Sequence, residues 1–216
     1  MAPIRYNSPV SKAKQIWPPL LLLIAIVAAG IYFISRPPAP APNEIEGLLW
    51  PPGNPLPNFT LRTERGDKFD IGNLKGRWSW VFFGYTECPD ICPTTLRTMN
   101  RIADKMAGDK EAQFIFVSID PEHDNPEQMQ RYLQTTAPKV TGLSGSAGEI
   151  AQITRELGIA HTTAANPSAS GSIEHTASIL LLDPLARRVA IFSPPLDAEA
   201  LIKRYETIRQ FVAANQ

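Results

Sequence analysis

The two cysteines of this chain lie in one short stretch, between an apolar run and an amphipathic segment. The run from Trp80 to Phe83 has the character of a buried strand, and Gly84 ends it. Pro93 suits the first position of a helix, because its φ is fixed and it has no N–H to leave unpaired. Apolar residues then continue at helical spacing: Leu96, Met99, Ile102, Ala103 and Met106. The stretch therefore predicts a strand, a turn that carries both cysteines, and a helix over about residues 93–107.

The spacing of Cys88 and Cys92 places both thiols at or just before the start of this helix. The partial positive charge of a helix N-terminus favours a thiolate over a thiol. Two thiolates form either a redox-active pair or part of a site for a soft metal. Two cysteines are too few for a disulfide framework or for a four-thiolate zinc site.

The N-terminal part of the chain predicts a membrane anchor. Residues 17–35 are uncharged, and their apolar core of 18 residues is near the lower limit for a bilayer span. Three bases precede this segment and Arg36 follows it, which places residues 1–16, a basic arm, in the cytoplasm. A cleaved signal peptide is the alternative, because Ala39-Pro40-Ala41 resembles a cleavage site, although Pro42 disfavours cleavage there.

Both interpretations export the rest of the chain. The basic arm is too short and too poor in arginine for a transit peptide. We therefore expect a single-pass protein of a bacterial inner membrane with its soluble domain in the periplasm, rather than a protein of the mitochondrial inner membrane that faces the intermembrane space.

A proline-rich linker is expected over residues 36–57, which contain eight prolines. It is either a stiff spacer or a disordered tether without a defined length. Residues 58–216 form the expected folded domain. Its strands are expected at 59–61, 67–71, 79–83, 113–119, 178–182 and 189–192, and its helices at 93–107, 126–135, 148–157 and after Asp197.

This order of strands and helices predicts an α/β domain with a mixed central sheet and helices on both faces. A cysteine pair between the first core strand and the first helix is the arrangement of thioredoxin. Residues 1–36 hold four of the 21 basic residues and no acid, so the remaining 180 residues carry 17 bases and 21 acids, a net charge of −4. This balance argues against a nucleic-acid partner, which requires a basic face.

One of the three histidines is a candidate metal ligand. His175 immediately precedes the expected strand 178–182, and in a thioredoxin-like fold the loop that leads into this strand faces the cysteine turn. Thioredoxins carry a cis-proline there, whereas this chain has no proline between Pro167 and Pro184. Two thiolates and one imidazole suit Cu(I), and zinc would accept the same ligands plus a fourth. Capping of the strand is the alternative role for His175. His123 and His161 are interpreted as solvated loop residues.

Three motifs carry a family resemblance, and they fall in the same order as in that family. The motifs are Gly84-Tyr85-Thr86-x-Cys88-Pro89-Asp90-Ile91-Cys92-Pro93-x-x-Leu96, Ser118-Ile119-Asp120-Pro121-x-x-Asp124-x-Pro126, and Glu174-His175-Thr176. Residues 58–212 thereby resemble the Sco/SenC family of copper proteins. The resemblance implies a thioredoxin fold and one copper ion, Cu(I) or Cu(II), held by Cys88, Cys92 and His175. It leaves Asp120 as a nearby acid without an assigned role.

The resemblance also implies a function and partners. It indicates a metallochaperone that delivers copper, or a reducing equivalent, to the binuclear copper centre of cytochrome c oxidase subunit II or a related acceptor. A copper donor or a thiol reductant would be a second partner. The alternative is a thiol–disulfide oxidoreductase in which Cys88 and Cys92 cycle on the same or another exported cysteine pair. A peroxidase related to peroxiredoxins is a third hypothesis.

Three features depart from the family pattern. Family members usually have Asp where Glu174 stands, and often Arg where His123 stands. The stretch 161–172 is rich in Ala, Ser and Thr and lacks aromatic residues. None of these departures removes an expected ligand.

Overall fold

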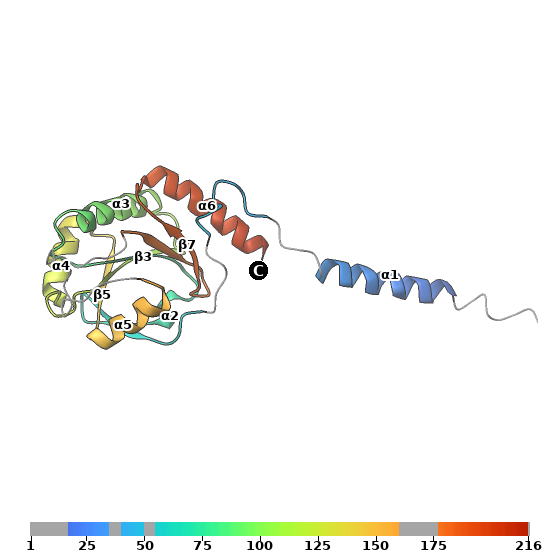
Figure 1. Cartoon of the computed structure of the whole chain (residues 1–216), viewed down its shortest axis with the longest axis horizontal. Coiled ribbons are helices and arrows are strands. Elements are labelled where there is room, and N and C mark those ends of the chain that lie inside the picture. Colours follow the sequence, from blue (N-terminus) through green and yellow to red (C-terminus); the bar gives the residue numbers. More distant parts are fainter. Residues whose placement is uncertain (1–16, 35–39, 50–54, 160–176, 216) are drawn as a thin grey trace, which may run out of the picture. The chain divides into compact units, whose positions relative to one another are not determined.

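The computed structural model describes residues 17–34, 40–49, 55–159 and 177–215, in two compact units. The first unit contains one helix, α1 (Trp17–Ile34), drawn in blue in Figure 1. A helix of 18 residues is about 27 Å long, against about 30 Å for the hydrocarbon core of a bilayer. No helix within the described part of the chain is long and apolar enough to cross a membrane. The structure therefore does not support the transmembrane helix expected over residues 17–35.

The second unit is built on one seven-stranded sheet with the order β2-β1-β5-β4-β3-β6-β7. Strands β3, β4 and β5 are parallel to one another, and the remaining pairings are antiparallel. This mixed sheet confirms the expected α/β class. The strands are β1 (Thr60–Thr63), β2 (Lys68–Asp70), β3 (Trp78–Gly84), β4 (Ala112–Ser118), β5 (Thr141–Ser144), β6 (Ile179–Leu182) and β7 (Arg188–Phe192).

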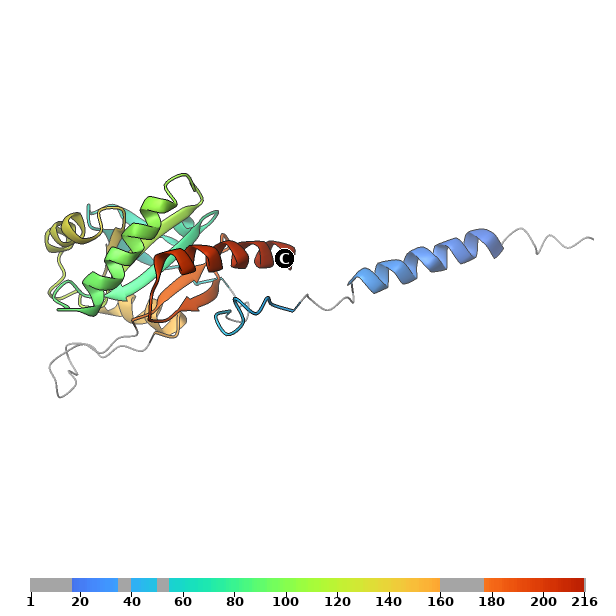
Figure 2. The same cartoon turned by 90° about the horizontal axis from the view of Figure 1, so that it is seen from above.

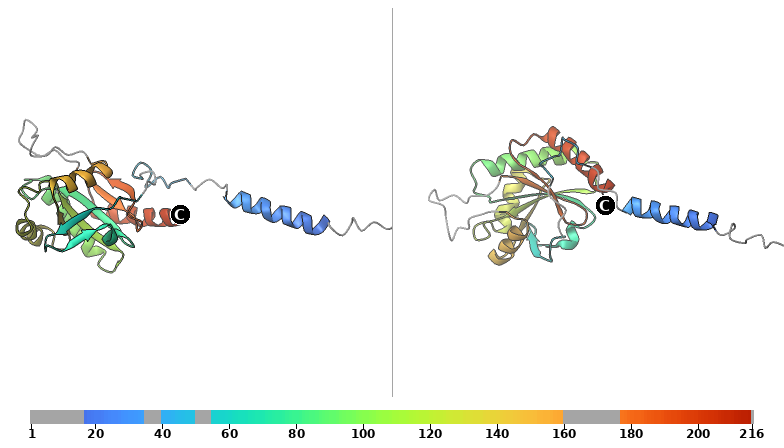
Figure 3. Two further views of the ribbon diagram at one scale, coloured as in Figure 1. Left: turned by 90° about the horizontal axis from the view of Figure 1, so that it is seen from below. Right: turned by 45° about the vertical axis from the view of Figure 1, so that its right-hand side comes forward.

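Helices cover both faces of the sheet, as Figure 3 shows. They are α2 (Ile71–Leu74), α3 (Ile91–Lys105), α4 (Pro126–Thr136), α5 (Ala147–Glu156) and α6 (Ala198–Ala214). Successive side chains of a strand point to opposite faces, so β3 contributes to two cores. Trp80 and Phe82 pack with residues of α3, α4 and α6, whereas Val81 and Phe83 pack with residues of α2 and α5. Figure 2 shows α3 and α6 lying across the same face.

Local signals in the sequence explain several element ends. The β1–β2 hairpin turns at Gly66, whose φ of +87° is a conformation that glycine adopts without strain. Helix α4 begins after Asn125, whose side chain accepts a hydrogen bond from the Gln128 N–H at 2.9 Å. Helix α3 begins at Ile91, two residues before the expected start at Pro93.

A segment of the expected linker is part of the folded domain. The compact unit begins at Ala41, not at residue 58, and Ile45 is 0% exposed in the core beside α6. The backbone N–H of Ile191 in β7 donates to the carbonyl of Leu48 at 3.0 Å. The spacer expected over residues 36–57 therefore ends earlier than its proline content predicts, because an apolar side chain within it is buried.

Replacement of Ile45 by alanine is expected to lower the free energy of unfolding by roughly 2–5 kcal/mol, because it leaves a cavity in the core. Thermal and chemical unfolding of the full chain measure this change. The control is Glu44→Ala, which removes only an exposed ion pair with Lys203 and should change stability by less than about 1 kcal/mol. Equal stability of the Ile45 variant and the wild type would show that segment 41–49 does not pack in solution.

Candidate metal centre

The cysteine turn joins the end of β3 to the start of α3. Cys88 lies in the turn and is half-buried, whereas Cys92 lies in the first turn of α3 and is 0% exposed. Neither cysteine forms a disulfide bond. The structure thus places the two cysteines that were predicted from the sequence close together. Cys88 is more exposed to solvent than Cys92.

Gly84 allows this close approach of the helix to the strand. A Cβ atom at residue 84 would lie 2.8 Å from Cys92 Sγ and 3.0 Å from the ring of Phe116. The distance to the sulfur is too short for a Cβ atom, and the distance to the ring would require Phe116 to shift. A glycine at the last position of β3 therefore leaves the space that the sulfur of Cys92 occupies.

The two cysteines contact each other through a backbone hydrogen bond. The N–H of Cys92 donates to Cys88 Sγ at 3.4 Å, and the N–H of Cys88 donates to the Tyr85 carbonyl at 3.4 Å. The first contact ties the sulfur of Cys88 to the first turn of α3.

The sequence predicted that both thiols lose their protons easily, and Cys92 does not fit this prediction. Burial raises the pKa of the Cys92 thiol well above its usual range, and the neighbouring Cys88 raises this pKa further. Removal from water disfavours the charged form of a thiol. Burial therefore favours the neutral form of the Cys92 thiol.

The loop between β4 and α4 places an acidic group beside the cysteine turn. The Asp120 carboxylate contacts Nδ1 of His123 at 2.9 Å, and this interaction raises the pKa of His123. The His123 side chain is 57% exposed. His123 is thus a loop residue paired with Asp120, which agrees with its interpretation as a solvated histidine. Sequence reasoning assigned nothing to Asp124, which is buried in this loop.

The third expected ligand, His175, lies outside the described residues, as does His161. Among the described residues, no group of three or more His, Cys, Asp or Glu side chains is arranged to hold a metal ion. The strand that follows His175 is placed as expected, because β6 pairs antiparallel with β3 and Ile179 lies opposite Phe82. The chain therefore enters β6 beside the end of β3 from which the cysteine turn begins.

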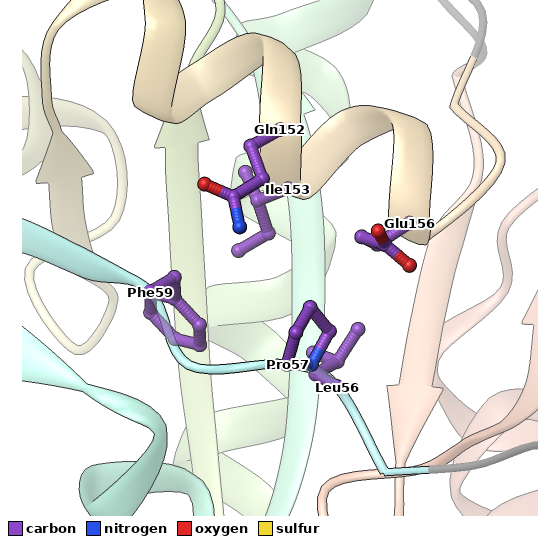
Figure 4. A pocket seen from close by; sticks show the side chains of 6 residues that line it. All are labelled: Leu56, Pro57, Phe59, Gln152, Ile153 and Glu156. Atoms are coloured by element: carbon purple, nitrogen blue, oxygen red, sulfur yellow. The ribbon is translucent and has the colours of Figure 1, made fainter.

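A shallow surface hollow lies between α5 and the segment before β1. Figure 4 shows its lining residues, which are Leu56, Pro57, Phe59, Gln152, Ile153 and Glu156. No thiol or imidazole is among them. This hollow is not a second candidate for the chemistry of the cysteine turn.

A mixed sheet with a cysteine pair between its first parallel core strand and the next helix defines a thioredoxin-like domain. The sequence model of the family described as SCO1/SenC matches residues 52–210. This chain therefore belongs to the SCO1/SenC family.

Individual relatives agree with this assignment. Protein sco1 of Schizosaccharomyces pombe is 30% identical over 193 residues, which cover 85% of this chain and 73% of that protein. A Stutzerimonas stutzeri protein whose name describes it as copper-binding is 29% identical over 165 residues, which cover 76% and 81% of the two chains. The structure of Bradyrhizobium japonicum ScoI with copper bound matches with a TM-score of 0.63 and 33% identity, over 71% of this chain and 99% of that one.

Proposed function

We propose that this chain is a copper metallochaperone for the assembly of cytochrome c oxidase, in which one copper ion is the cargo. The observation that carries the proposal is the pair of contacting, reduced cysteines at the start of α3 in a member of the SCO1/SenC family. Thiolates are soft ligands that select Cu(I). A similar solved structure, ScoI of Bradyrhizobium japonicum, has copper bound.

His175 is proposed as the third ligand. It lies four residues before Ile179, which is opposite Phe82 in the sheet. Four residues span at most about 14 Å, so an imidazole at position 175 is within reach of the cysteine turn. Two thiolates and one imidazole leave the copper ion open to a further ligand.

The unequal burial of the two cysteines suggests how cargo leaves. Cys88 is half-buried and Cys92 is fully buried, so a ligand of an acceptor protein reaches the metal from the Cys88 side. Stepwise exchange would then release Cys88 first and Cys92 last. In the alternative, a thiol–disulfide oxidoreductase, the more exposed Cys88 would be the attacking thiol and the buried Cys92 its partner.

Copper binding is expected to strengthen as pH rises. Each thiol that loses its proton on binding makes the apparent affinity roughly tenfold higher per pH unit below the pKa of that thiol. Burial keeps Cys92 protonated, so its proton must be displaced throughout the neutral range. Competition titrations with a Cu(I) chelator of known pH dependence, from pH 6 to pH 8, measure this slope. A pH-independent affinity would show that neither thiol gives up a proton.

The location of the chain is also a proposal, supported by the sequence. The uncharged segment 17–35, with three bases before it and Arg36 after it, favours attachment to a bacterial inner membrane and export of the domain to the periplasm. Expression of the full chain, followed by protease treatment of spheroplasts and alkaline extraction of membranes, tests both points. Cleavage of the domain by external protease and its retention in the membrane fraction are expected. A protected or extractable chain would contradict export or attachment, respectively.

Transfer to an acceptor tests the proposed function. The full chain, loaded with one equivalent of Cu(I), is mixed anaerobically with the metal-free copper domain of cytochrome c oxidase subunit II. Copper is expected to move to the acceptor faster than it dissociates to a chelator alone. Equal rates would show that no directed transfer occurs, and transfer of reducing equivalents without copper would favour the oxidoreductase alternative.

A further inference from the structure

Asp124 is a buried carboxylate that is hydrogen-bonded to the cysteine turn. It is 1% exposed, and its carboxylate accepts hydrogen bonds from two residues of different segments. The N–H of Thr86 donates at 3.1 Å, the hydroxyl of Thr86 at 2.5 Å, and the hydroxyl of Ser118 at 2.6 Å. Hydrogen bonds to a charged acceptor are among the stronger ones in proteins.

These contacts join three parts of the domain. Thr86 belongs to the cysteine turn, Ser118 is the last residue of β4, and Asp124 lies just before α4. Gln128 of α4 adds a fourth contact, because its side-chain amide donates to the Thr86 hydroxyl at 2.9 Å. Thr86 is thus held by its backbone and its side chain at once.

The position of Thr86 bears directly on Cys88, two residues further along the chain. Cys92 is fixed by its burial within α3. Cys88 has no regular secondary structure around it, and its N–H donates to the Tyr85 carbonyl at 3.4 Å, which is long for a bond to oxygen. Its sulfur accepts from the Cys92 N–H, on the far side of the turn, at 3.4 Å. The strongest fixed point of the turn before Cys88 is therefore the Thr86–Asp124 contact.

We propose that Asp124 is a positioning residue that, through Thr86, holds Cys88 where its sulfur and that of Cys92 can share one metal ion. The proposal rests on the proposed copper site for its functional meaning. The structural part of the proposal is that Asp124 fixes the turn that carries Cys88. This part does not depend on copper binding. Release of this contact would leave Cys92 in place and free Cys88 to move away from it.

The matched control is Asp183, a second buried carboxylate at the opposite end of the sheet. Asp183 is 0% exposed and accepts hydrogen bonds from the backbone N–H groups of Leu185 and Arg187 at 3.0 and 2.9 Å, and its second oxygen pairs with the Arg187 side chain, whose Nε donates at 2.7 Å. It lies in the β6–β7 turn, next to Leu182, which pairs with Ser79 at the start of β3. Asp183→Ala therefore removes a comparable structural contact far from the cysteine turn.

The first measurement is Cu(I) affinity of the full chain by anaerobic chelator competition. Asp124→Ala is expected to weaken binding roughly tenfold or more, the usual effect of removing support for a metal ligand. Asp124→Asn, which keeps the shape and one acceptor oxygen, should recover part of the loss, and Asp183→Ala should stay within about twofold of the wild type. Wild-type affinity in a folded Asp124→Ala variant would overturn the proposal.

The second measurement needs no copper. The alkylation rates of Cys88 and Cys92 in the reduced, metal-free chain are compared by mass spectrometry. Asp124→Ala is expected to speed alkylation of Cys88 roughly tenfold, while Asp183→Ala leaves it unchanged. Thr86→Val, which removes only the hydroxyl contacts, should act in the same direction if Asp124→Ala fails to fold. An unchanged Cys88 rate in these variants overturns the proposal, whereas a wild type that binds no copper overturns only the proposed function.

Discussion

A chain with both Cys88→Ala and Cys92→Ala is expected to lose its tight copper site, with a fall in Cu(I) affinity of at least about a thousandfold, or about 4 kcal/mol. The two sulfurs are the only soft ligands that the sequence supplies apart from methionines and histidines. No other cluster of His, Cys, Asp or Glu among the described residues is arranged to take over the metal. The measurement is copper retained per chain after competition with a Cu(I) chelator.

Thr98→Ala is the control for this double variant. Thr98 is 2% exposed and lies on the same helix, where its hydroxyl donates to the Thr94 carbonyl at 3.2 Å. The control therefore alters a buried group of α3 without touching either sulfur, and it should keep wild-type affinity. Retention of one copper per chain in the double cysteine variant would place the metal elsewhere and remove the basis of the chaperone proposal.

Replacement of His175 by alanine is expected to weaken Cu(I) binding about a hundredfold, or about 2.7 kcal/mol, while the two thiolates continue to hold the ion. The same substitution at His123 is the matched control. His123 contacts Asp120 through Nδ1 and its side chain is 57% exposed, so its loss should change copper affinity less than about twofold. Equal effects of the two substitutions would show that His175 has no special role.

The sequence predicted those parts of the fold that depend on local signals. The cysteine turn between a buried strand and a helix, the hairpin at Gly66 and the start of α4 after Asn125 were all readable from neighbouring residues. Strand β5 was not expected, because Thr141–Ser144 is short and contains a glycine. It is a strand because it pairs with β4 on one side and β1 on the other, and both partners are distant in sequence.

The burial of Ile45 also depends on distant contacts. Ile45 lies between Glu44 and Glu46 in a segment with eight prolines over residues 36–57, so the proline content predicted a linker, even though Leu48 and Leu49 follow closely. The side chain is nevertheless buried in the core beside α6, and the adjacent Leu48 carbonyl accepts a hydrogen bond from β7. Composition indicates where a chain is stiff, but it does not show which apolar side chain is buried against a distant part of the fold.

The sequence predicted the two cysteines of the candidate site but not the environment of those cysteines. The motif spacing selected Cys88 and Cys92, but the raised pKa of Cys92 follows from burial behind Gly84 and could not be read from the turn itself. Asp124 could not be assigned to the site from the sequence, because its hydrogen-bond partner Thr86 is 38 residues earlier in the chain. A signal was present, since the motif Asp120-Pro121-x-x-Asp124 fixes the spacing that brings this carboxylate to the turn.

X-ray absorption of the copper-loaded full chain tests the central claim most directly, because it counts the atoms bound to the metal. The protein is reduced, loaded anaerobically with one equivalent of Cu(I) and measured beside the His175→Ala variant. The proposed site predicts two sulfur ligands and one nitrogen ligand in the wild type, and loss of the nitrogen alone in the variant. A first coordination sphere with fewer than two sulfur atoms, or one that is identical in the two proteins, would contradict the site of Cys88, Cys92 and His175.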